Sequence, residues 1–278
     1  MGELFRNILN ASVQGSLVIA VVLILRPLLW KAPKKYICLL WVLVGLRLLN
    51  PFSIESKLSL QPQTEAFTAG LCQALVQGGD FLPLLWMVCA AGMLFYSMIS
   101  YAMLKLRLRE AIRVGPEVWE SDRIDTAFVL GYILPCIYLP MDIDGLYREL
   151  VLQHERCHLK RLDHWVKLLM FVALAVHWFN PLVWLAYVLL CWDTEYACDE
   201  LVIRDMSLEE RKHYSAALLA CSSKLSYLTA SAVPFGEKPI KRRIKAVLRY
   251  RKPALWATVL AISALILVAV CFLTNPTL

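Results

Sequence analysis

Residues 165–192 read WVKLLMFVALAVHWFNPLVWLAYVLLCW, and this apolar stretch decides the fold. It is long enough for a membrane span, but His177, Asn180 and Pro181 interrupt its middle. Each half then holds about 12–15 residues, or roughly 18–22 Å of helix, which is too short for a hydrocarbon core of ~30 Å. We therefore predict a re-entrant helical hairpin that dips into the membrane and returns to the same side. Its polar turn needs hydrogen-bond partners from other helices, because lipid offers none.

The composition around this stretch also indicates a membrane protein. Of 278 residues, 59% are hydrophobic and 18% charged, against a usual ~45–50% apolar and ~25% charged. These values exclude intrinsic disorder and an ordinary cytosolic enzyme, and nine cysteines without paired spacing imply no disulfide framework. The net charge of +7 comes from Lys and Arg residues where apolar runs end, so we interpret them as topology determinants and expect no direct nucleic-acid partner.

Four other runs have about the length and composition of transmembrane helices. They cover residues 11–30, 36–52, 81–104 and 254–273. The first run lacks the cleavage site of a signal peptide, so we expect it to remain. The predicted fold is therefore mainly α and polytopic, with four spans, the hairpin and a cytoplasmic zinc domain with a small β element. The predicted parts are residues 1–104 with three spans, 105–252 with the zinc domain, and 253–278 with the fourth span and a short external tail.

The distribution of cations predicts the orientation. The turn after the first run is basic, and so are both ends of the segment 105–252, whereas the charged residues of the loop after Pro51 are mostly acidic. Because cytoplasmic loops are enriched in Lys and Arg, the central segment should lie inside and both termini outside. The basic residues used are Arg26, Lys31, Lys34, Lys35, Lys105, Arg107, Arg109, Arg113, Lys238, Lys241, Arg242, Arg243, Lys245, Arg249, Arg251 and Lys252.

The central segment begins with a stretch, residues 126–140, that is typical of a short hairpin or edge strand. It is rich in β-branched and aromatic residues and is interrupted by Gly131, Pro135 and Pro140. The part from Ala127 to Leu139 could offer a substrate peptide an edge for strand pairing. A hairpin that merely covers the next helix is an equal alternative.

That next helix should begin after Asp144 and contains His154-Glu155-Arg156-Cys157-His158. Residues four apart share a helix face, so both imidazoles can bind one Zn²⁺, and Glu155 is aimed at the water that the zinc activates. Two surface histidines on an ion-paired helix are the alternative. The otherwise apolar character of this face favours the metal site.

A catalytic zinc takes three protein ligands. The third can come from a second pair of residues with i, i+4 spacing, which is acidic. Glu195 and Asp199 are also four apart, so on a helix they project together. One can bind the metal, while the other binds it too or orients a histidine. Asp163 is a further candidate for orienting a histidine. Cys157 and Cys198 adjoin the ligands in sequence, and we expect them to be small packed residues.

These residues resemble the membrane metallopeptidase domain of the BlaR/MecR antirepressor family, the bacterial transducers of β-lactam resistance. The resemblance extends over nearly the whole chain, and a weaker kinship links it to CAAX-protease and HtpX-type gluzincins. It is carried by Phe128-Val129-Leu130-Gly131, Ile137-Tyr138-Leu139-Pro140, HERCH with Arg161 and Asp163, Asn180-Pro181, Glu195-x-x-x-Asp199 and the late Arg243-Ile244.

The resemblance implies a gluzincin-type zinc metalloendopeptidase in the bacterial cell membrane, with one zinc per chain. His154, His158 and Glu195 would bind the metal, Asp199 would bind it or orient a ligand, and Glu155 would be the catalytic acid and base. The implied partner is a cytoplasmic substrate, typically a winged-helix repressor, with self-cleavage also implied and a homo-oligomer left open. Antibiotic sensors of this family continue into an external penicillin-binding domain, and the expectation here is a metallopeptidase domain without that sensor.

Several points stay open at this stage. Tyr196, His213, Tyr214 and Arg243 are candidate oxyanion donors, each equally able to be structural. A site-2-type intramembrane protease is disfavoured, because the residues around HERCH are too charged for such a depth. A zinc-binding scaffold or signalling protein without hydrolysis is the non-enzymatic alternative.

Overall fold

The computed structural model describes residues 2–49, 55–56, 65–76, 81–223, 240–272 and 275–276. The chain forms two compact units, and each is described by itself. The helical unit comprises Met1–Phe95, Leu168–Leu190 and Pro253–Leu278, and the site unit comprises Tyr96–Lys167 and Cys191–Lys252. The predicted span ends at Phe52 and Leu273 and the basic residue Lys238 lie outside the described residues.

Three helices in the described chain are long and apolar enough to cross a membrane: α1 (Gly2–Leu28), α4 (Phe81–Arg107, extended by the 3₁₀ turn η1, Leu108–Glu110) and α10 (Leu255–Phe272). They agree with three of the four predicted spans. The remaining run forms α2 (Lys34–Leu49), which has 16 residues. At about 1.5 Å per residue this helix is shorter than a typical hydrocarbon core, so the expected four spans are found only in part.

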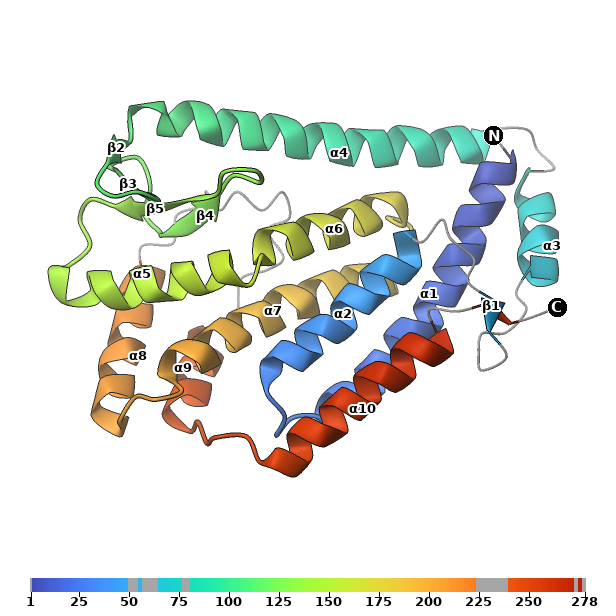
Figure 1. Ribbon diagram of the computed structural model, residues 1–278. Helices are drawn as coiled ribbons and strands as arrows, with labels where there is room; N and C mark the ends of the chain where they lie inside the picture. Colours follow the sequence, from blue (N-terminus) through green and yellow to red (C-terminus); the bar gives the residue numbers. More distant parts are fainter. Residues whose placement is uncertain are drawn as a thin grey trace. The chain divides into compact units, whose positions relative to one another are not determined.

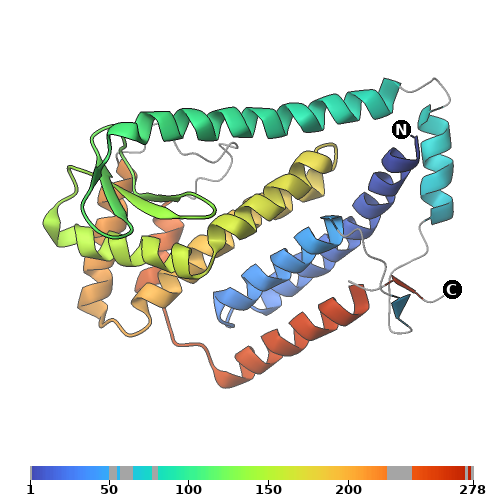
Figure 2. The ribbon, with the colours of Figure 1, turned by 45° about the horizontal axis from the view of Figure 1, so that its top comes forward.

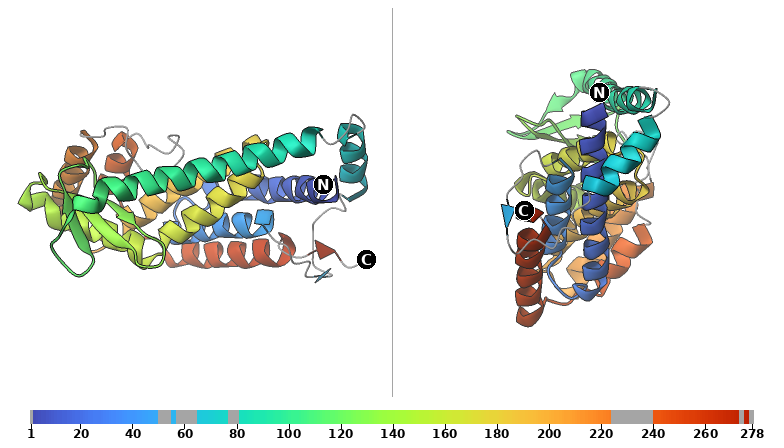
Figure 3. Two further views of the ribbon diagram at one scale, coloured as in Figure 1. Left: turned by 90° about the horizontal axis from the view of Figure 1, so that it is seen from above. Right: turned by 90° about the vertical axis from the view of Figure 1, so that its right-hand side faces the viewer.

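Helices α1, α2 and α10 lie side by side in the helical unit (Figure 3). Their contact surfaces are apolar and fully buried at Ile19 and Val22 of α1 and at Leu40 and Trp41 of α2. Gly15 lets α1 approach α2 closely, because a Cβ there would lie 2.3 Å from Leu48 Cδ2. The unit also contains α3 (Glu65–Val76), which packs against α1.

The interrupted apolar stretch forms two helices, α6 (Asp163–Val176) and α7 (Pro181–Ile203), with the break where the sequence predicts it (Figure 1). Pro181 begins α7, a position where its missing N–H has no cost and its fixed φ suits the helix. Helix α7 is longer than the predicted hairpin arm. It continues past Trp192 and carries the two acidic residues on the same helix as the turn.

The polar turn between α6 and α7 forms hydrogen bonds with neighbouring helices. His177 Nε2 lies 3.1 Å from the carbonyl oxygen of Leu48, at the end of α2. Asn180 Nδ2 donates to the hydroxyl oxygens of Ser12 and Ser16 on α1, both at 2.8 Å. The indole of Trp86 on α4 donates to a carbonyl at the end of α6, at 2.7 Å. Three neighbouring helices therefore bond to the turn, as predicted, although His177 Nδ1 and the indole nitrogen of Trp178 are buried without a partner among the described residues.

The site unit contains a four-stranded sheet in the order β2-β3-β5-β4. The strands are β2 (Ile112–Arg113), β3 (Val118–Ser121), β4 (Phe128–Leu130) and β5 (Cys136–Pro140). β4 and β5 form the predicted hairpin, with Val129 opposite Ile137, and β4 is an edge strand. β5 also pairs in parallel with β3, with Val118 opposite Ile137, and this pairing was not predicted. A separate two-residue parallel pair joins β1 (Glu55–Ser56) and β6 (Asn275–Pro276).

The sheet packs on α5 (Gly145–Lys160), the helix that carries HERCH (Figure 1). Ile137 and Leu139 of β5 are completely buried, and they form one core cluster with Val151 and Leu152 of α5. A second cluster joins Ile203 at the end of α7 to α8 (Leu208–Ser223) and α9 (Ile240–Leu248). The apolar face of α5 is thus packed against the sheet. The second cluster holds α7, α8 and α9 together.

Removal of the Asn180 side-chain amide should destabilise the hairpin. Asn180→Ala eliminates hydrogen bonds to Ser12 and Ser16, and we expect the free energy of unfolding to fall by about 1–3 kcal/mol. Thermal unfolding in detergent or nanodiscs measures the change. Ser263→Ala is the control, because that exposed hydroxyl bonds only within its own helix, to the Leu260 carbonyl. Equal unfolding midpoints for Asn180→Ala and the control would contradict the role of the turn.

Candidate metal centre

The two histidines of HERCH converge at the buried face of α5. His154 and His158 are 6% and 8% exposed, and their Nε2 atoms lie 3.2 Å apart. Their rings meet edge to face, with centroids 4.8 Å apart. One turn of helix therefore aims both Nε2 atoms at a common point, as the i, i+4 spacing predicts.

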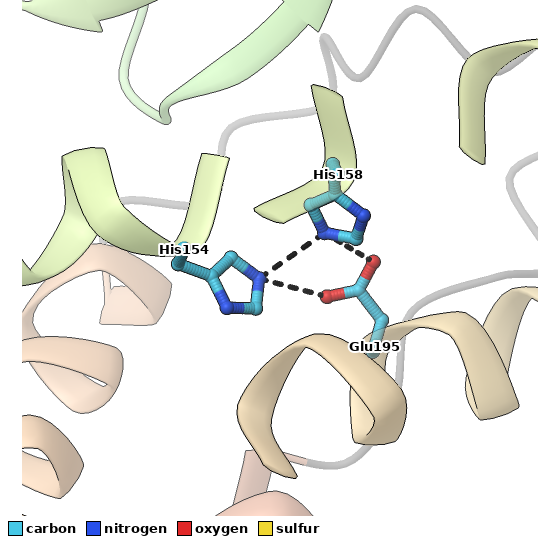
Figure 4. A group of neighbouring side chains, drawn as sticks. All are labelled: His154, His158 and Glu195. Carbon is cyan, nitrogen blue, oxygen red and sulfur yellow. Dashed lines mark hydrogen bonds and ion pairs between the residues drawn. The ribbon is translucent and has the colours of Figure 1, made fainter. Parts of the chain in front are cut away.

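Glu195 of α7 completes this group (Figure 4). Its Oε1 lies 3.4 Å from His158 Nε2, and its Oε2 lies 3.5 Å from His154 Nε2. In a tetrahedral zinc site with bonds of about 2.0–2.1 Å, ligand atoms lie roughly 3.3–3.4 Å from one another. The three side chains therefore have both the chemistry and the spacing that zinc requires.

Two cations flank the Glu195 carboxylate. Arg243 Nη1 lies 3.1 Å from Oε2, and Lys167 Nζ lies 3.5 Å from Oε1. Burial would raise the pKa of Glu195, but the charges of His158 and Arg243 hold it well below its usual range. Burial would likewise lower the pKa of His158, but Glu195 and Asp163 raise it to about 9. Glu195 is thus an anionic candidate ligand in a site with strong internal charge pairing.

Asp199 lies one turn beyond Glu195, but its carboxylate has other partners. Arg243 donates to both of its oxygens, with Nε at 2.8 Å and Nη2 at 2.5 Å. The hydroxyl of Tyr214 donates to Oδ1 at 2.8 Å and also lies 2.8 Å from His154 Nδ1. Asp199 therefore faces the Nδ1 side of His154, so the geometry favours a carboxylate that orients this histidine rather than a metal ligand.

Asp163 has the equivalent position beside the second histidine. Its Oδ2 lies 2.8 Å from His158 Nδ1 and 3.2 Å from Arg161 Nε. The adjacent Leu162 has a φ of 56°, a left-handed conformation that ends α5 and brings Asp163 back to the site at the start of α6. The buried thiol of Cys198 lies 3.3 Å from His158 Nδ1, so it packs directly against the site. Burial raises the pKa of this thiol, so it remains neutral.

His158, Asp163 and Cys198 form a second group that could hold a metal ion. It shares His158 with the first group but uses the opposite ring nitrogen, Nδ1. Asp163 already contacts that nitrogen, and this contact fixes the ring so that Nε2 faces Glu195 and His154. The first group is therefore the better candidate metal centre.

The other candidates occupy different surroundings. Glu155 is 8% exposed, and its carboxylate has no hydrogen bond or ion pair among the residues that the structure describes. His213 is exposed and Tyr196 is half-buried, whereas Tyr214 and Arg243 contact the candidate ligands directly. The structure thus brings two of the four candidate oxyanion donors to the site.

Two cations of the site were missed or misjudged from sequence. Lys167 has a signal in the sequence, because it is the lone charge within residues 165–192. The sequence predicts Arg243 both as a topology determinant in the basic run before α10 and as a candidate oxyanion donor, but only 13% of its side chain is exposed and it pairs with the carboxylates of Glu195 and Asp199. Nothing in a run of neighbouring cations distinguishes the one that turns inward.

Comparisons with known proteins place the chain in a family. It matches the family described as BlaR1 peptidase M56 over residues 72–247. It is 32% identical over 152 residues to the regulatory protein BlaR1 of Bacillus licheniformis, covering 51% of this chain and 25% of that protein. It is 26% identical over 138 residues to the methicillin resistance mecR1 protein of Staphylococcus aureus, covering 47% and 24%. The chain spans about a quarter of the length of these curated relatives. Since the family match covers more than half of its residues, the chain belongs to the BlaR1 peptidase M56 family.

Proposed function

We propose that this protein is a membrane zinc metalloendopeptidase that cleaves a cytoplasmic protein. The carrying observation is the group of His154 Nε2, His158 Nε2 and a Glu195 oxygen, which lie at 3.2–3.5 Å from one another. Membership in a peptidase family supports the reaction type. The proposed location is the bacterial cell membrane, with several passes, both termini external and the active site cytoplasmic.

The proposed substrate is a winged-helix transcriptional repressor, with self-cleavage as a second reaction. The names of the matched relatives, a regulatory protein and a methicillin resistance protein, agree with a signalling role. The edge strand β4, which packs near α5, could pair with an extended peptide and bring its scissile bond to the metal.

Each residue of the site has a defined task in this reaction. When bound, zinc supplies the Lewis acidity that activates a water molecule and polarises the scissile carbonyl. Glu155 takes the proton from the attacking water and transfers it to the leaving amine. Asp163 holds His158 through Nδ1, while Tyr214 and Asp199 hold His154 in the same way. Arg243 Nη2, at 3.4 Å from His154 Nε2, is placed to stabilise negative charge developing on the carbonyl oxygen.

The proposal predicts one zinc per chain, lost when a ligand is removed. Glu195→Ala should lower the bound zinc to well below one per chain, because the remaining two imidazoles do not hold the ion. Metal analysis of the purified protein measures this ratio. Glu149→Ala is the matched control, since the Glu149 side chain is 63% exposed on α5. Full zinc occupancy in Glu195→Ala would contradict the assignment.

Catalysis should depend on Glu155 separately from metal binding. Glu155→Ala should reduce cleavage of a co-expressed repressor by about 10²–10⁴-fold or more, because it removes the proton carrier, while zinc content stays unchanged. Immunoblotting of the repressor and metal analysis of the same preparation give both readouts. Cleavage at the wild-type rate by the variant would reject the protease function and favour a zinc-binding scaffold.

The hydroxyl of Tyr214 should strengthen metal binding through His154. Tyr214→Phe retains the buried ring but removes the hydroxyl that bridges His154 and Asp199, so we expect zinc affinity to fall by about 10–100-fold. Competition with a chelator measures the affinity. Tyr250→Phe is the matched control, because the buried hydroxyl of Tyr250 has no hydrogen-bond partner within the described residues. Equal affinities for the two variants would exclude this role for Tyr214.

A further inference from the structure

The tip of the β4–β5 hairpin presents two large aliphatic side chains outward. Ile133 is 89% exposed and Leu134 is 83% exposed, and both lie in the short connection, residues 131–135, between β4 and β5. The turn is closed by Gly131, which has a φ of +108°. A Cβ at Gly131 would lie 2.7 Å from the carbonyl oxygen of Leu134, so only glycine permits this turn. The chain therefore holds two apolar side chains away from its own core by a specific backbone geometry.

Tyr132, which directly precedes Ile133, contacts both α4 and α6. Tyr132 stacks on Tyr101 of α4, with ring centroids 5.6 Å apart, and lies 5.7 Å from the ring of Trp165 on α6. Figure 2 shows the hairpin tip beside the first turns of α6. Helix α4 is one of the three candidate membrane spans, and Tyr101 precedes its basic last turn with Lys105 and Arg107. Tyrosine and tryptophan next to cations at the end of a span are typical of the membrane interface.

Exposed apolar side chains also occur on the part of α4 that Tyr132 contacts. In the site unit, α4 exposes Met98, Met103 and Leu106, at 68%, 52% and 67%. On a membrane span such side chains face lipid. The stacking of Tyr132 on Tyr101 places the hairpin tip at the level of this surface, next to the cations that contact lipid headgroups.

We propose that Ile133 and Leu134 insert into the boundary between lipid headgroups and acyl chains and anchor the sheet to the inner membrane surface. Residues of β4 directly precede the tip, so this contact would hold the open edge of β4 close to the bilayer. A substrate peptide that pairs with β4 would then approach along the membrane surface. The anchor depends on the proposed topology but not on zinc binding or hydrolysis.

Photo-crosslinking from the tip tests this contact. The full chain carries p-benzoylphenylalanine at position 133, or separately at 134, in the Glu155→Ala background and in vesicles of phosphatidylethanolamine and phosphatidylglycerol. Position 259 on α10, where Val259 is 66% exposed in a candidate span, gives the lipid-facing reference. Position 112 on β2, where Ile112 is 57% exposed at the other edge of the same sheet, gives the matched control.

After irradiation, mass spectrometry should detect lipid adducts at 133 or 134 at the level of position 259 and well above that of position 112. Lipid adducts at both tip positions no more abundant than at 112 would overturn the proposal. Protein adducts without lipid adducts, after a repressor is added, would also overturn it and identify the tip as a protein-docking element. Because the variants lack Glu155, neither outcome depends on whether the protein hydrolyses peptides.

Discussion

The proposed metal centre imposes one constraint: its candidate ligands come from α5 and from α7, which are separated in sequence by a long apolar stretch. A single membrane crossing by that stretch would place Glu195 on the other side of the bilayer from His158. The break at residues 177–180 divides the stretch into two helices, so that the chain can leave the site through α6 and return to it through α7. The contacts agree with this path: Asp163 at the start of α6 meets His158, and Glu195 in the second half of α7 meets both imidazoles.

The break contains polar side chains among apolar helices, and neighbouring helices form hydrogen bonds with His177 and Asn180. His177 and Asn180 bond to groups on α2 and α1, and Trp86 bonds to the end of α6. Each of these hydrogen bonds gives a polar group of the break a partner within the protein, which a membrane interior would require. The other end of the helix pair has the opposite character, with cations and carboxylates concentrated around the candidate ligands. The same two helices thus carry the polar groups of the turn and charged groups of the candidate metal centre.

Much of the site was predictable from sequence because its chemistry is local. The spacing of His154 and His158 and that of Glu195 and Asp199 follow from helix geometry, and the break before Pro181 follows from backbone chemistry. The β4–β5 hairpin was also predicted. Strands β2 and β3 were missed, because strands of two and four residues show too little alternation to be recognised. The run at residues 36–52 is not confirmed as a span, because its described helix α2 has 16 residues.

The partners of the ligands could not be derived in the same way. Arg243 is far in sequence from Glu195 and Asp199 and reaches them only because α9 packs in a core with α7 and α8. Tyr214 joins His154 to Asp199 for the same reason. Such contacts depend on tertiary packing, which cannot be predicted from the periodicity of a local sequence segment.

X-ray absorption at the zinc edge of the wild-type protein tests the central assignment most directly. It distinguishes the group of His154, His158 and Glu195 from the alternative group of His158, Asp163 and Cys198. We predict only nitrogen and oxygen ligands at about 2.0–2.2 Å, two of them with imidazole scattering. A sulfur ligand at about 2.3 Å would contradict this account, because it would place the ion on the Nδ1 side of His158 and away from Glu195.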